Sequence, residues 1–176
     1  ASKAASRPTD RFTNFALTQT VHALAPWWRP ALKQGKLNFE NPADLIYVLR
    51  AYGGKDVTGQ VRGLIQSDEI SAAGRRELLR LLARVGTAND LQTVFSHAQK
   101  DPELLESLPN IASIRRLVPA GEIHAELATL LRSKDTGIRG SAARLAGLWK
   151  QQQLIPLLEP LVDSKENDEV RAAAIR

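Results

Sequence analysis

The chain of 176 residues contains no cysteine and no methionine. The absence of cysteine excludes disulfides, thiolate nucleophiles, iron–sulfur clusters, cysteine-ligated zinc and covalent attachment of c-type haem. Aromatic residues make up only 5% of the chain, and Leu and Ala supply most of its apolar content. Because strands favour branched and aromatic side chains, this composition predicts an all-α protein.

Long hydrophobic runs and a signal-peptide core are also missing. No apolar stretch approaches the roughly 18 residues of a membrane span, so we expect no membrane insertion. The polar residues 1–8 lack the apolar centre of a secretion signal. The absence of methionine, including an initiator, leads us to expect that the sequence is a fragment of a larger multidomain protein.

The net charge of +5 is unevenly distributed along the chain. Residues 1–88 contain 13 Lys and Arg against 7 Asp and Glu, whereas residues 89–176 contain 11 against 12. The first half is therefore +6 and the second −1. An anionic partner is expected to contact the first half.

A short apolar pattern recurs five times, as one apolar residue, two spacers and two further apolar residues. The copies are Trp28/Ala31/Leu32, Val61/Leu64/Ile65, Leu91/Val94/Phe95, Leu127/Leu130/Leu131 and Leu154/Leu157/Leu158. They begin 33, 30, 36 and 27 residues apart. The spacing i, i+3, i+4 places each set on one face of a helix, so the pattern predicts a helical repeat of about 31 residues.

A second apolar stripe precedes each copy. The stripes are Phe12/Phe15/Ala16/Leu24, Leu45/Val48/Leu49/Tyr52, Leu78/Leu81/Leu82/Val85, Leu104/Leu108/Ile111/Ile114 and Ile138/Ala142/Leu145/Ala146. Helix-start signals stand at Asn41-Pro42, Thr87–Asp90 and Asp101-Pro102, and stop signals at Gly53-Gly54 and Gly86. No segment alternates with period two. Each repeat is therefore predicted to be two antiparallel helices.

These patterns predict a leader and one repeat domain. Residues 1–9 are expected to be disordered or extended, and residues 10–176 to form a single solenoid of stacked helix pairs. The predicted repeats are 10–38, 41–67, 70–99, 101–133, 135–163 and an incomplete 166–176.

Two segments, residues 133–143 and 164–174, resemble HEAT repeats, since each has an acidic turn followed by an aliphatic–Arg pair and alanines. The resemblance implies a right-handed α–α superhelix of about five antiparallel helix pairs plus an incomplete one. Arg139 and Arg171 are 32 residues apart. In HEAT proteins this Arg commonly pairs with an Asp of a neighbouring turn, which implies structural roles for both arginines and for Asp135 and Asp168.

A narrower resemblance covers residues 10–52, with Asp10-Arg11-Phe12, Phe15-Ala16-Leu17, Leu24–Leu32 and Gly35-Lys36-Leu37. This run is similar to the helical middle domain of PVC-type haem-binding (membrane-bound dehydrogenase-like) proteins of planctomycetes and verrucomicrobia. It implies an internal spacer or docking domain of a larger exported redox protein, hence an extracytoplasmic or periplasmic location. The haem-attaching Cys-x-x-Cys-His motif is absent, so no haem chemistry carries over to these residues.

The chemistry-bearing residues do not form a recognisable catalytic or metal motif. The three histidines, His22, His97 and His124, lack the i, i+3 or i, i+4 spacing that places two metal ligands on one helix face. The Gly53-Gly54-Lys55 run lacks the first glycine and the Ser/Thr of a phosphate loop. We expect this segment to have no catalytic residues, cofactor or metal, although the parent chain could be an oxidoreductase.

Two features are candidate binding surfaces. The first is a row of arginines predicted opposite the apolar stripe of its helix, namely Arg75, Arg76, Arg80 and Arg84. It would contact nucleic acid or an acidic polymer; alternatively it is a solvated helix face partnered by Glu77 and Asp90. The second is Trp27, which would be buried, cap the first repeat or lie at an interface, whereas Trp28 belongs to the apolar pattern.

We therefore predict a non-catalytic protein-interaction or scaffold module whose partner is another protein or neighbouring domains of the same chain. The alternative is a HEAT-like nucleic-acid-binding domain that uses the basic first half, and nucleic acid is the less favoured partner. An enzyme similar to the HEAT-like alkylpurine DNA glycosylases needs a carboxylate and aromatics in one groove, a set that the sequence does not provide.

Overall fold

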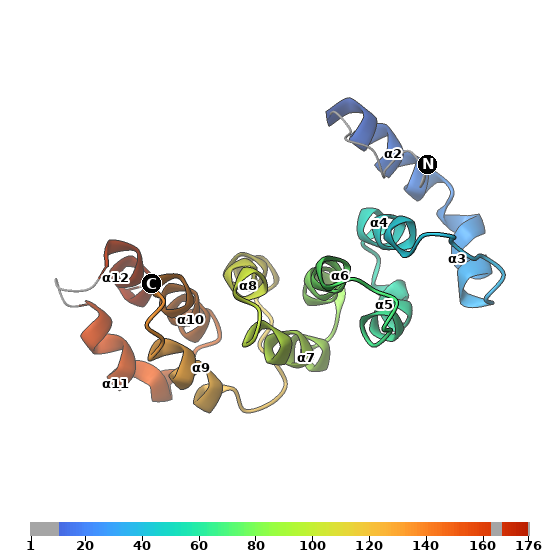
Figure 1. The fold of residues 1–176 in the computed structure, drawn as a ribbon. Coiled ribbons are helices and arrows are strands. Elements are labelled where there is room, and N and C mark those ends of the chain that lie inside the picture. The colour runs from blue at the N-terminus through green and yellow to red at the C-terminus, as the bar shows by residue number, and fades with distance from the viewer. Residues whose placement is uncertain (1–10, 163–166, 176) are drawn as a thin grey trace. The chain divides into compact units, whose positions relative to one another are not determined.

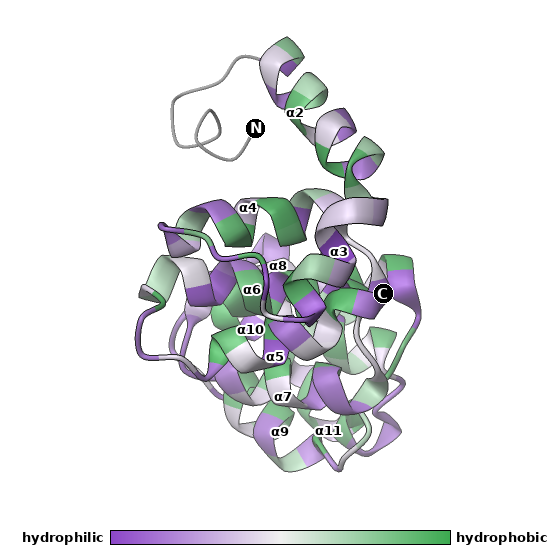
Figure 2. Cartoon of the chain, turned by 90° about the vertical axis from the view of Figure 1, so that its right-hand side faces the viewer, coloured by the Kyte–Doolittle hydropathy of each residue, from purple (hydrophilic) through white to green (hydrophobic). Residues whose placement is uncertain are grey.

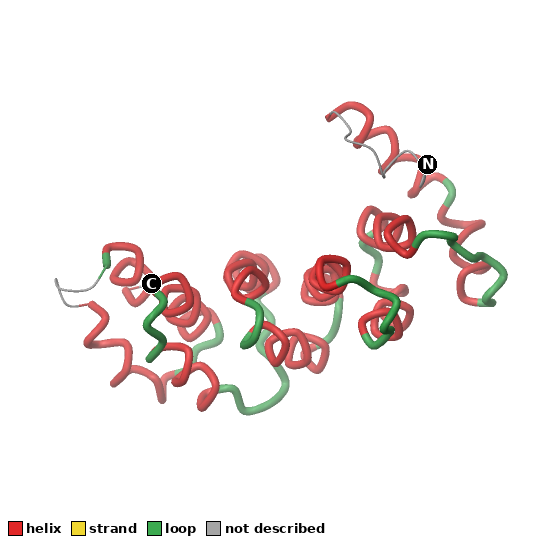
Figure 3. Tube along the Cα trace, viewed as in Figure 1, coloured by secondary structure: helices red, strands yellow, loops and turns green. Residues whose placement is uncertain are grey.

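The computed structural model describes residues 11–162 and 167–175. Within these ranges the chain forms eleven α-helices and three short 3₁₀ segments, without a strand (Figures 1 and 3). The prediction of an all-α protein is confirmed. The predicted leader 1–9 lies outside the described residues, as does part of the HEAT-like segment 164–174.

Helices follow one another along the described part of the chain, joined by short connections. In chain order they are α2 (Arg11–Ala23), α3 (Ala25–Lys33), α4 (Pro42–Tyr52), α5 (Thr58–Ile65), α6 (Ala72–Val85), α7 (Ala88–Ala98), α8 (Pro102–Arg115), α9 (His124–Leu131), α10 (Thr136–Leu148), α11 (Ile155–Leu158) and α12 (Asp168–Ile175). The 3₁₀ segments are η1 (Lys55–Val57), η2 (Gln152–Leu154) and η3 (Glu159–Val162). The second helix of the fifth pair is divided among η2, α11 and η3, because Pro156 and Pro160 lack the N–H that a continuous helix needs.

The helix ends carry the caps that the sequence predicts. Asn41 accepts a hydrogen bond from the Ala43 N–H at 3.0 Å, and Asp101 accepts one from the Leu104 N–H at 3.1 Å. Thr87 and Asp90 form a reciprocal capping box at the start of α7. Gly53 ends α4 in the left-handed conformation, with φ of 63°, which a residue without a Cβ adopts at little cost.

The chain divides into two compact units, residues 1–85 and 86–176. The boundary falls between α6 and α7, within the predicted repeat 70–99.

The first unit places α4 at its centre. Helix α4 packs against α2 on one side and α6 on the other, while α3 contacts α2 and α5 contacts α6. Its interior is formed by aliphatic side chains that are almost completely buried, including Leu49, Val57, Val61, Leu78 and Leu81. The first helices of three successive pairs are therefore neighbours.

The second unit repeats this arrangement around α10. Helix α10 packs between α8 and α12 and also contacts α9, while α7 packs on α8 and α11 on α9, which gives two layers of helices (Figure 1). Ala142, Ala143 and Ala146 of α10 are buried, and such small side chains allow neighbouring helices to approach closely. A Cβ at Gly140 would lie 3.9 Å from Val170 of α12, an ordinary contact distance.

The predicted apolar stripe of α2 is exposed rather than buried, and so is the last residue of the α8 stripe, whose other three members are buried. On α2, Phe12 is 84% exposed and Phe15 is 66% exposed, and Ile114 on α8 is 75% exposed. Helix α2 packs with its opposite face, where Val21 is buried. The sequence pattern identified an apolar face of α2 correctly, and hydrophobic segments recur along this helix (Figure 2), but that face has no neighbour within the described part of the first unit.

Candidate binding surfaces

The four arginines of α6 have different surroundings, and only Arg84 is fully exposed. Arg75 donates from Nε to the Ile65 carbonyl and from a terminal nitrogen to the Ser67 carbonyl, both at 2.9 Å. Its guanidinium therefore ties α6 to the turn that precedes it. Arg76 and Arg80 are half-buried.

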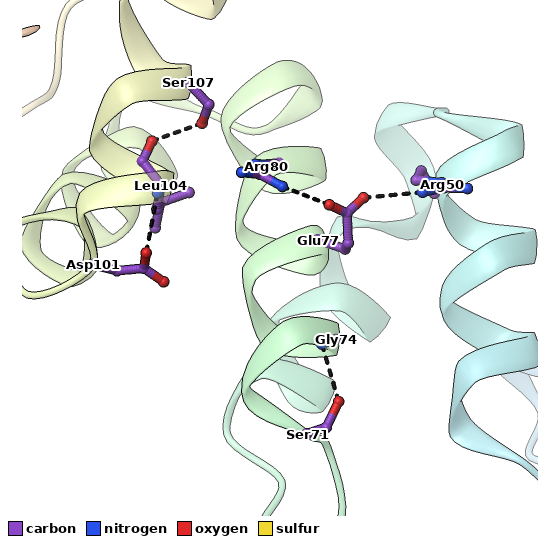
Figure 4. A network of polar contacts seen from close by, with 8 residues as sticks. All are labelled: Arg50, Ser71, Gly74, Glu77, Arg80, Asp101, Leu104 and Ser107. Atoms are coloured by element: carbon purple, nitrogen blue, oxygen red, sulfur yellow. Dashed lines mark hydrogen bonds and ion pairs between the residues drawn. The ribbon is translucent and has the colours of Figure 1, made fainter. Parts of the chain in front are cut away.

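Glu77 joins two helices of the first unit by accepting from two arginines. Arg80 of α6 donates to one carboxylate oxygen at 2.7 Å, and Arg50 of α4 donates to the other at 3.1 Å (Figure 4). Burial alone would raise the pKa of Glu77, but the hydrogen bonds from Arg80 and Arg50 outweigh it and hold that pKa below its ordinary value. The carboxylate is therefore charged at neutral pH and holds α4 against α6.

These contacts correct the expectation of a uniformly exposed basic ridge. Arg75 is bonded to backbone carbonyls and Arg80 to a carboxylate, so neither presents an open guanidinium. Glu77 is the partner that the solvated-face alternative named, whereas Asp90 caps α7. The helical spacing was right, but it could not show which arginines are engaged by local acceptors.

Trp27 lies at the surface, with 70% of its area exposed, so a core position is excluded. Trp28 is half-buried, and its indole Nε1 donates to the Val21 carbonyl at 2.9 Å. This bond holds the start of α3 against the end of α2. The next residue, Arg29, belongs to a cluster of side chains that was not predicted from the sequence.

The cluster is centred on Tyr52, the last residue of α4. The Tyr52 hydroxyl donates to Asp56 at 3.0 Å, and Arg29 forms an ion pair with the same carboxylate. The Arg29 guanidinium lies 5.1 Å from the Tyr52 ring centroid, and Trp28 meets that ring edge to face at 5.3 Å. The exposed His22 ring lies 5.7 Å away.

The pKa shifts of Tyr52 and Asp56 indicate that this cluster has a structural role. Burial and the hydrogen bond to Asp56 raise the pKa of Tyr52, which keeps the phenol neutral. Burial opposes ionisation of Asp56, yet the hydrogen bonds from Tyr52 and Arg29 leave its pKa below the ordinary value. The three groups contact one another and connect α3 with the α4–α5 connection.

The second unit contains two adjoining pockets along α8, α10 and α12. One, of about 330 Å³, is mainly apolar and is lined by Pro109, Asn110, Ser113, Arg144 and Leu148. The other, of about 300 Å³, is mainly polar and is lined by Glu106, Thr136, Gly137, Gly140, Ser141, Arg144 and Glu169. Arg144 lines both, and the two pockets together are named here the Arg144 groove.

Arg144 differs from the arginines of α6 that have bonded partners. Its side chain is exposed and forms no hydrogen bond or ion pair with any residue that the structure describes. Glu106 and Glu169 line the polar part of the groove, while Pro109 and Leu148 line the apolar part. An unpaired guanidinium between these parts can receive a carboxylate through two parallel hydrogen bonds. Arg144 was not predicted as a site residue, because nothing in its spacing distinguishes it from other arginines of the chain.

Residues 11–162 and 167–175 contain neither a cluster of metal ligands nor a membrane-spanning helix. No group of three or more His, Asp or Glu side chains there is placed to hold a metal ion. None of the helices in these ranges is long and apolar enough to cross a membrane.

No protein-family model, curated protein or solved structure matches the chain. What the chain does must therefore be inferred from its own residues and contacts.

Proposed function

We propose that the chain is a non-catalytic docking module of the HEAT type, in which stacked helix pairs present a surface to a protein partner. The observation that carries this proposal is the packing of successive first helices, α2–α4–α6 in one unit and α8–α10–α12 in the other. Such stacking is the basis of α-solenoids, whose extended surfaces mostly serve protein binding.

Arginine positions support the HEAT assignment. Arg75, Arg139 and Arg171 each stand fourth in α6, α10 and α12. Arg139 donates to the carbonyls of Ser133 and Lys134 at 2.9 and 3.1 Å, much as Arg75 does in its own unit. Arg171 instead donates to Asp168 at 2.6 Å. An arginine that recurs at one register position in three of the six first helices supports a repeated structural unit.

The Arg144 groove is the proposed partner surface. A carboxylate would bind the Arg144 guanidinium, and an adjacent apolar side chain would enter the pocket beside Pro109 and Leu148. The proposed occupant is therefore an extended segment of a partner protein that has an acidic residue next to an apolar one. Glu106 and Glu169 would repel a second acidic residue at the polar end.

The nucleic-acid alternative receives less support from these contacts. Phosphate binding needs several free cationic side chains on one surface. On α6, Arg75 and Arg80 are already bonded to protein acceptors, although the first unit as a whole is basic. We infer that any binding to DNA or RNA is weak and is lost as salt is raised.

A display experiment with random 12-residue peptides tests the groove. Selected peptides should share an acidic residue beside an apolar one, and Arg144→Glu should abolish their binding. Arg84→Glu, a matched charge reversal at an exposed arginine of the other unit, should leave their binding unchanged. Peptides that bind both variants equally well, or a selection without acidic residues, would refute the assignment of the groove.

We further propose, from the resemblance of residues 10–52, that the module works as a spacer or docking domain in an exported redox protein. Fractionation of the source cells with an antibody against the chain tests this context. Recovery in the periplasmic or membrane fraction is expected, whereas recovery with cytoplasmic proteins would contradict it.

A further inference from the structure

The polar end of the Arg144 groove is bordered by charges of both signs that do not pair with one another. Arg144 of α10, Glu106 of α8 and Glu169 of α12 all line it. None of these side chains forms an ion pair or hydrogen bond with a residue that the structure describes. Opposite charges that border one space of about 300 Å³ without meeting leave room for a ligand that carries both signs.

The packing of α10 explains why the two carboxylates reach this space. Helix α10 packs between α8 and α12, so Glu106 and Glu169 come from the helices on either side of it. The wall that α10 contributes includes two glycines, Gly137 and Gly140. A Cβ at Gly137 would lie only 3.1 Å from Oε1 of Glu106, so the missing side chain lets this carboxylate approach the first turn of α10.

Ser141 supplies a second, independent sign of a ligand at this end of the groove. The residue is only 8% exposed and lines the polar pocket, and its hydroxyl forms no hydrogen bond with a described residue. Burying a hydroxyl without a partner costs free energy, and alanine, which follows at positions 142 and 143, would pack there without that cost. Ser141 stands three residues before Arg144, hence on the same side of α10. A donor hydroxyl and a donor guanidinium therefore face the same space.

We propose that the groove selects a partner segment in which an acidic residue lies between an apolar residue and a basic one. This inference rests on the proposed docking function and adds the basic residue to it. Arg144 and Ser141 donate hydrogen bonds to the partner carboxylate, and the apolar side chain packs beside Leu148. Glu106 and Glu169 accept hydrogen bonds from the partner's ammonium or guanidinium group.

The charge balance of the groove favours this partner over a purely acidic one. One guanidinium and two carboxylates give the polar end a charge of 1 − 2 = −1. An acidic residue alone would pair with Arg144 but would place a third carboxylate near Glu106 and Glu169, whereas an added basic residue turns that repulsion into attraction. A nucleic acid has no cationic group to offer, so it does not fit this end of the groove.

Fluorescence anisotropy with short synthetic peptides tests the proposal. The probes are acetyl-Gly-Leu-Asp-Xaa-Xaa-Gly-amide and the series with the reverse order, in which Xaa is Lys, Gln or Glu. In one of the two orders the Lys peptide should bind about fivefold more tightly than the Gln peptide, and the Glu peptide should bind most weakly. The net charge of the chain, +5, would by itself favour the Glu peptide, so nonspecific attraction cannot produce this ranking.

The possible results separate this inference from the proposed function. Equal binding of the Lys and Gln peptides would overturn the selection of a basic residue and leave the groove as a site for acidic and apolar residues. No binding of any peptide at about 1 mM would refute both.

Charge-neutralising variants show whether the two glutamates cause the preference. The double variant Glu106→Gln/Glu169→Gln should bind the Lys and Gln peptides equally, with an unchanged far-UV circular dichroism spectrum because both side chains are exposed. Glu122→Gln is the matched control, since Glu122 is an exposed and unpaired carboxylate of the same unit that does not line the groove. Glu122→Gln should keep the preference of the parent. A double variant that also keeps it would overturn the proposal.

Ser141→Ala tests the hydroxyl. This variant should weaken binding of the Lys and Gln peptides alike by about tenfold, because both lose a hydrogen bond to their carboxylate. Its urea midpoint should equal or exceed that of the parent, since no described residue loses a partner. Ser96→Ala, which removes a hydroxyl bonded to the Gln92 carbonyl away from the groove, should leave peptide binding unchanged. Unchanged peptide binding by Ser141→Ala, or a lowered urea midpoint, would show that the hydroxyl does not serve the ligand.

Discussion

Arg75 and Arg139 perform the same local task in separate units of the chain. Each is the fourth residue of a first helix and donates hydrogen bonds to backbone carbonyls just before that helix, of Ile65 at the end of α5 and Ser67 for Arg75, and of Ser133 and Lys134 for Arg139. They are 64 residues apart, which is twice the 32-residue interval between Arg139 and Arg171. Arg75 is therefore a structural residue, like Arg139, rather than a candidate ligand-binding residue.

Alanine at either position should therefore destabilise the protein without any ligand being involved. Arg75→Ala and Arg139→Ala each leave two backbone carbonyls without a charged donor, and we expect each to lower the free energy of unfolding by about 1–3 kcal/mol. Arg84→Ala should change it by less than about 0.5 kcal/mol, because that side chain is exposed. Urea unfolding at neutral pH measures all three. An Arg84→Ala variant as unstable as the other two would contradict this assignment.

The Glu77 network predicts a dependence of stability on pH. Because the folded-state pKa of Glu77 is lowered, its stabilising effect is present above the unfolded-state pKa and is lost as pH falls through the folded-state pKa. Glu77→Gln should be less stable than the parent by about 1 kcal/mol at pH 7, a magnitude typical of a partly exposed ion pair. The difference should shrink below about pH 4.

Thermal unfolding across that pH range gives the comparison. Glu122→Gln is the control, because Glu122 is exposed and forms no ion pair with a described residue. This control should differ little from the parent at any pH. A constant gap between Glu77→Gln and the parent from pH 7 down to pH 3 would rule out a contribution from the charge.

Gly54 is required by the Tyr52–Asp56 contact. A Cβ at this position would lie 2.2 Å from Cε1 of Tyr52 and 2.7 Å from the Asp56 carboxylate, so the ring would have to move and its hydrogen bond would break. We expect Gly54→Ala to cost about 1–3 kcal/mol. Gly63→Ala, where a Cβ meets nothing within 4 Å, should be neutral or slightly stabilising.

A double-mutant cycle isolates the cause of that cost. Once Tyr52→Ala has removed the ring, adding Gly54→Ala should cost much less than it does in the parent. Urea midpoints of the four proteins give the coupling energy. Additive effects would mean that the glycine is needed for some other reason.

The sequence predicted what depends on local structure. Helical spacing located the helices, and Asn41, Asp101 and the Thr87–Asp90 box were correctly identified as helix starts. A cap involves residues at most three positions apart, so its outcome does not depend on the rest of the fold. The broken helix at Pro156 and Pro160 was missed, since the apolar pattern Leu154/Leu157/Leu158 continues through it.

The binding surfaces were harder to predict because they depend on contacts between helices. Spacing placed Arg76, Arg80 and Arg84 along one helix. It left open whether they form an exposed binding ridge or a solvated face with acidic partners such as Glu77, which does bind Arg80. The contact of Arg29 with Tyr52 and Asp56 could not be predicted from the sequence. Arg29 lies in α3 and Tyr52 at the end of α4, and local spacing does not show how these two helices are placed relative to each other. Arg144 is identifiable only once its groove and its lack of a partner are known.

Trp149 combines close packing with an indole N–H that has no hydrogen-bond acceptor among the described residues. The side chain is 2% exposed and meets Phe95 edge to face at 5.2 Å, while its indole Nε1 has no acceptor among the described residues. Trp149→Ala should therefore cost about 3–5 kcal/mol through lost packing. Trp149→Phe loses part of that packing but also removes the buried N–H, whose desolvation costs about 1–3 kcal/mol. The two effects oppose each other, so the net loss should stay below about 1.5 kcal/mol.

Urea unfolding followed by far-UV circular dichroism distinguishes these contributions without relying on tryptophan fluorescence. Trp27→Phe is the matched control, and its effect should be near zero because Trp27 is 70% exposed. If Trp149→Phe is nearly as destabilising as Trp149→Ala, the indole N–H must contribute to stability through a hydrogen bond. An ordered water bridging Nε1 to a backbone carbonyl would then be the simplest physical explanation, since buried waters satisfy groups of this kind.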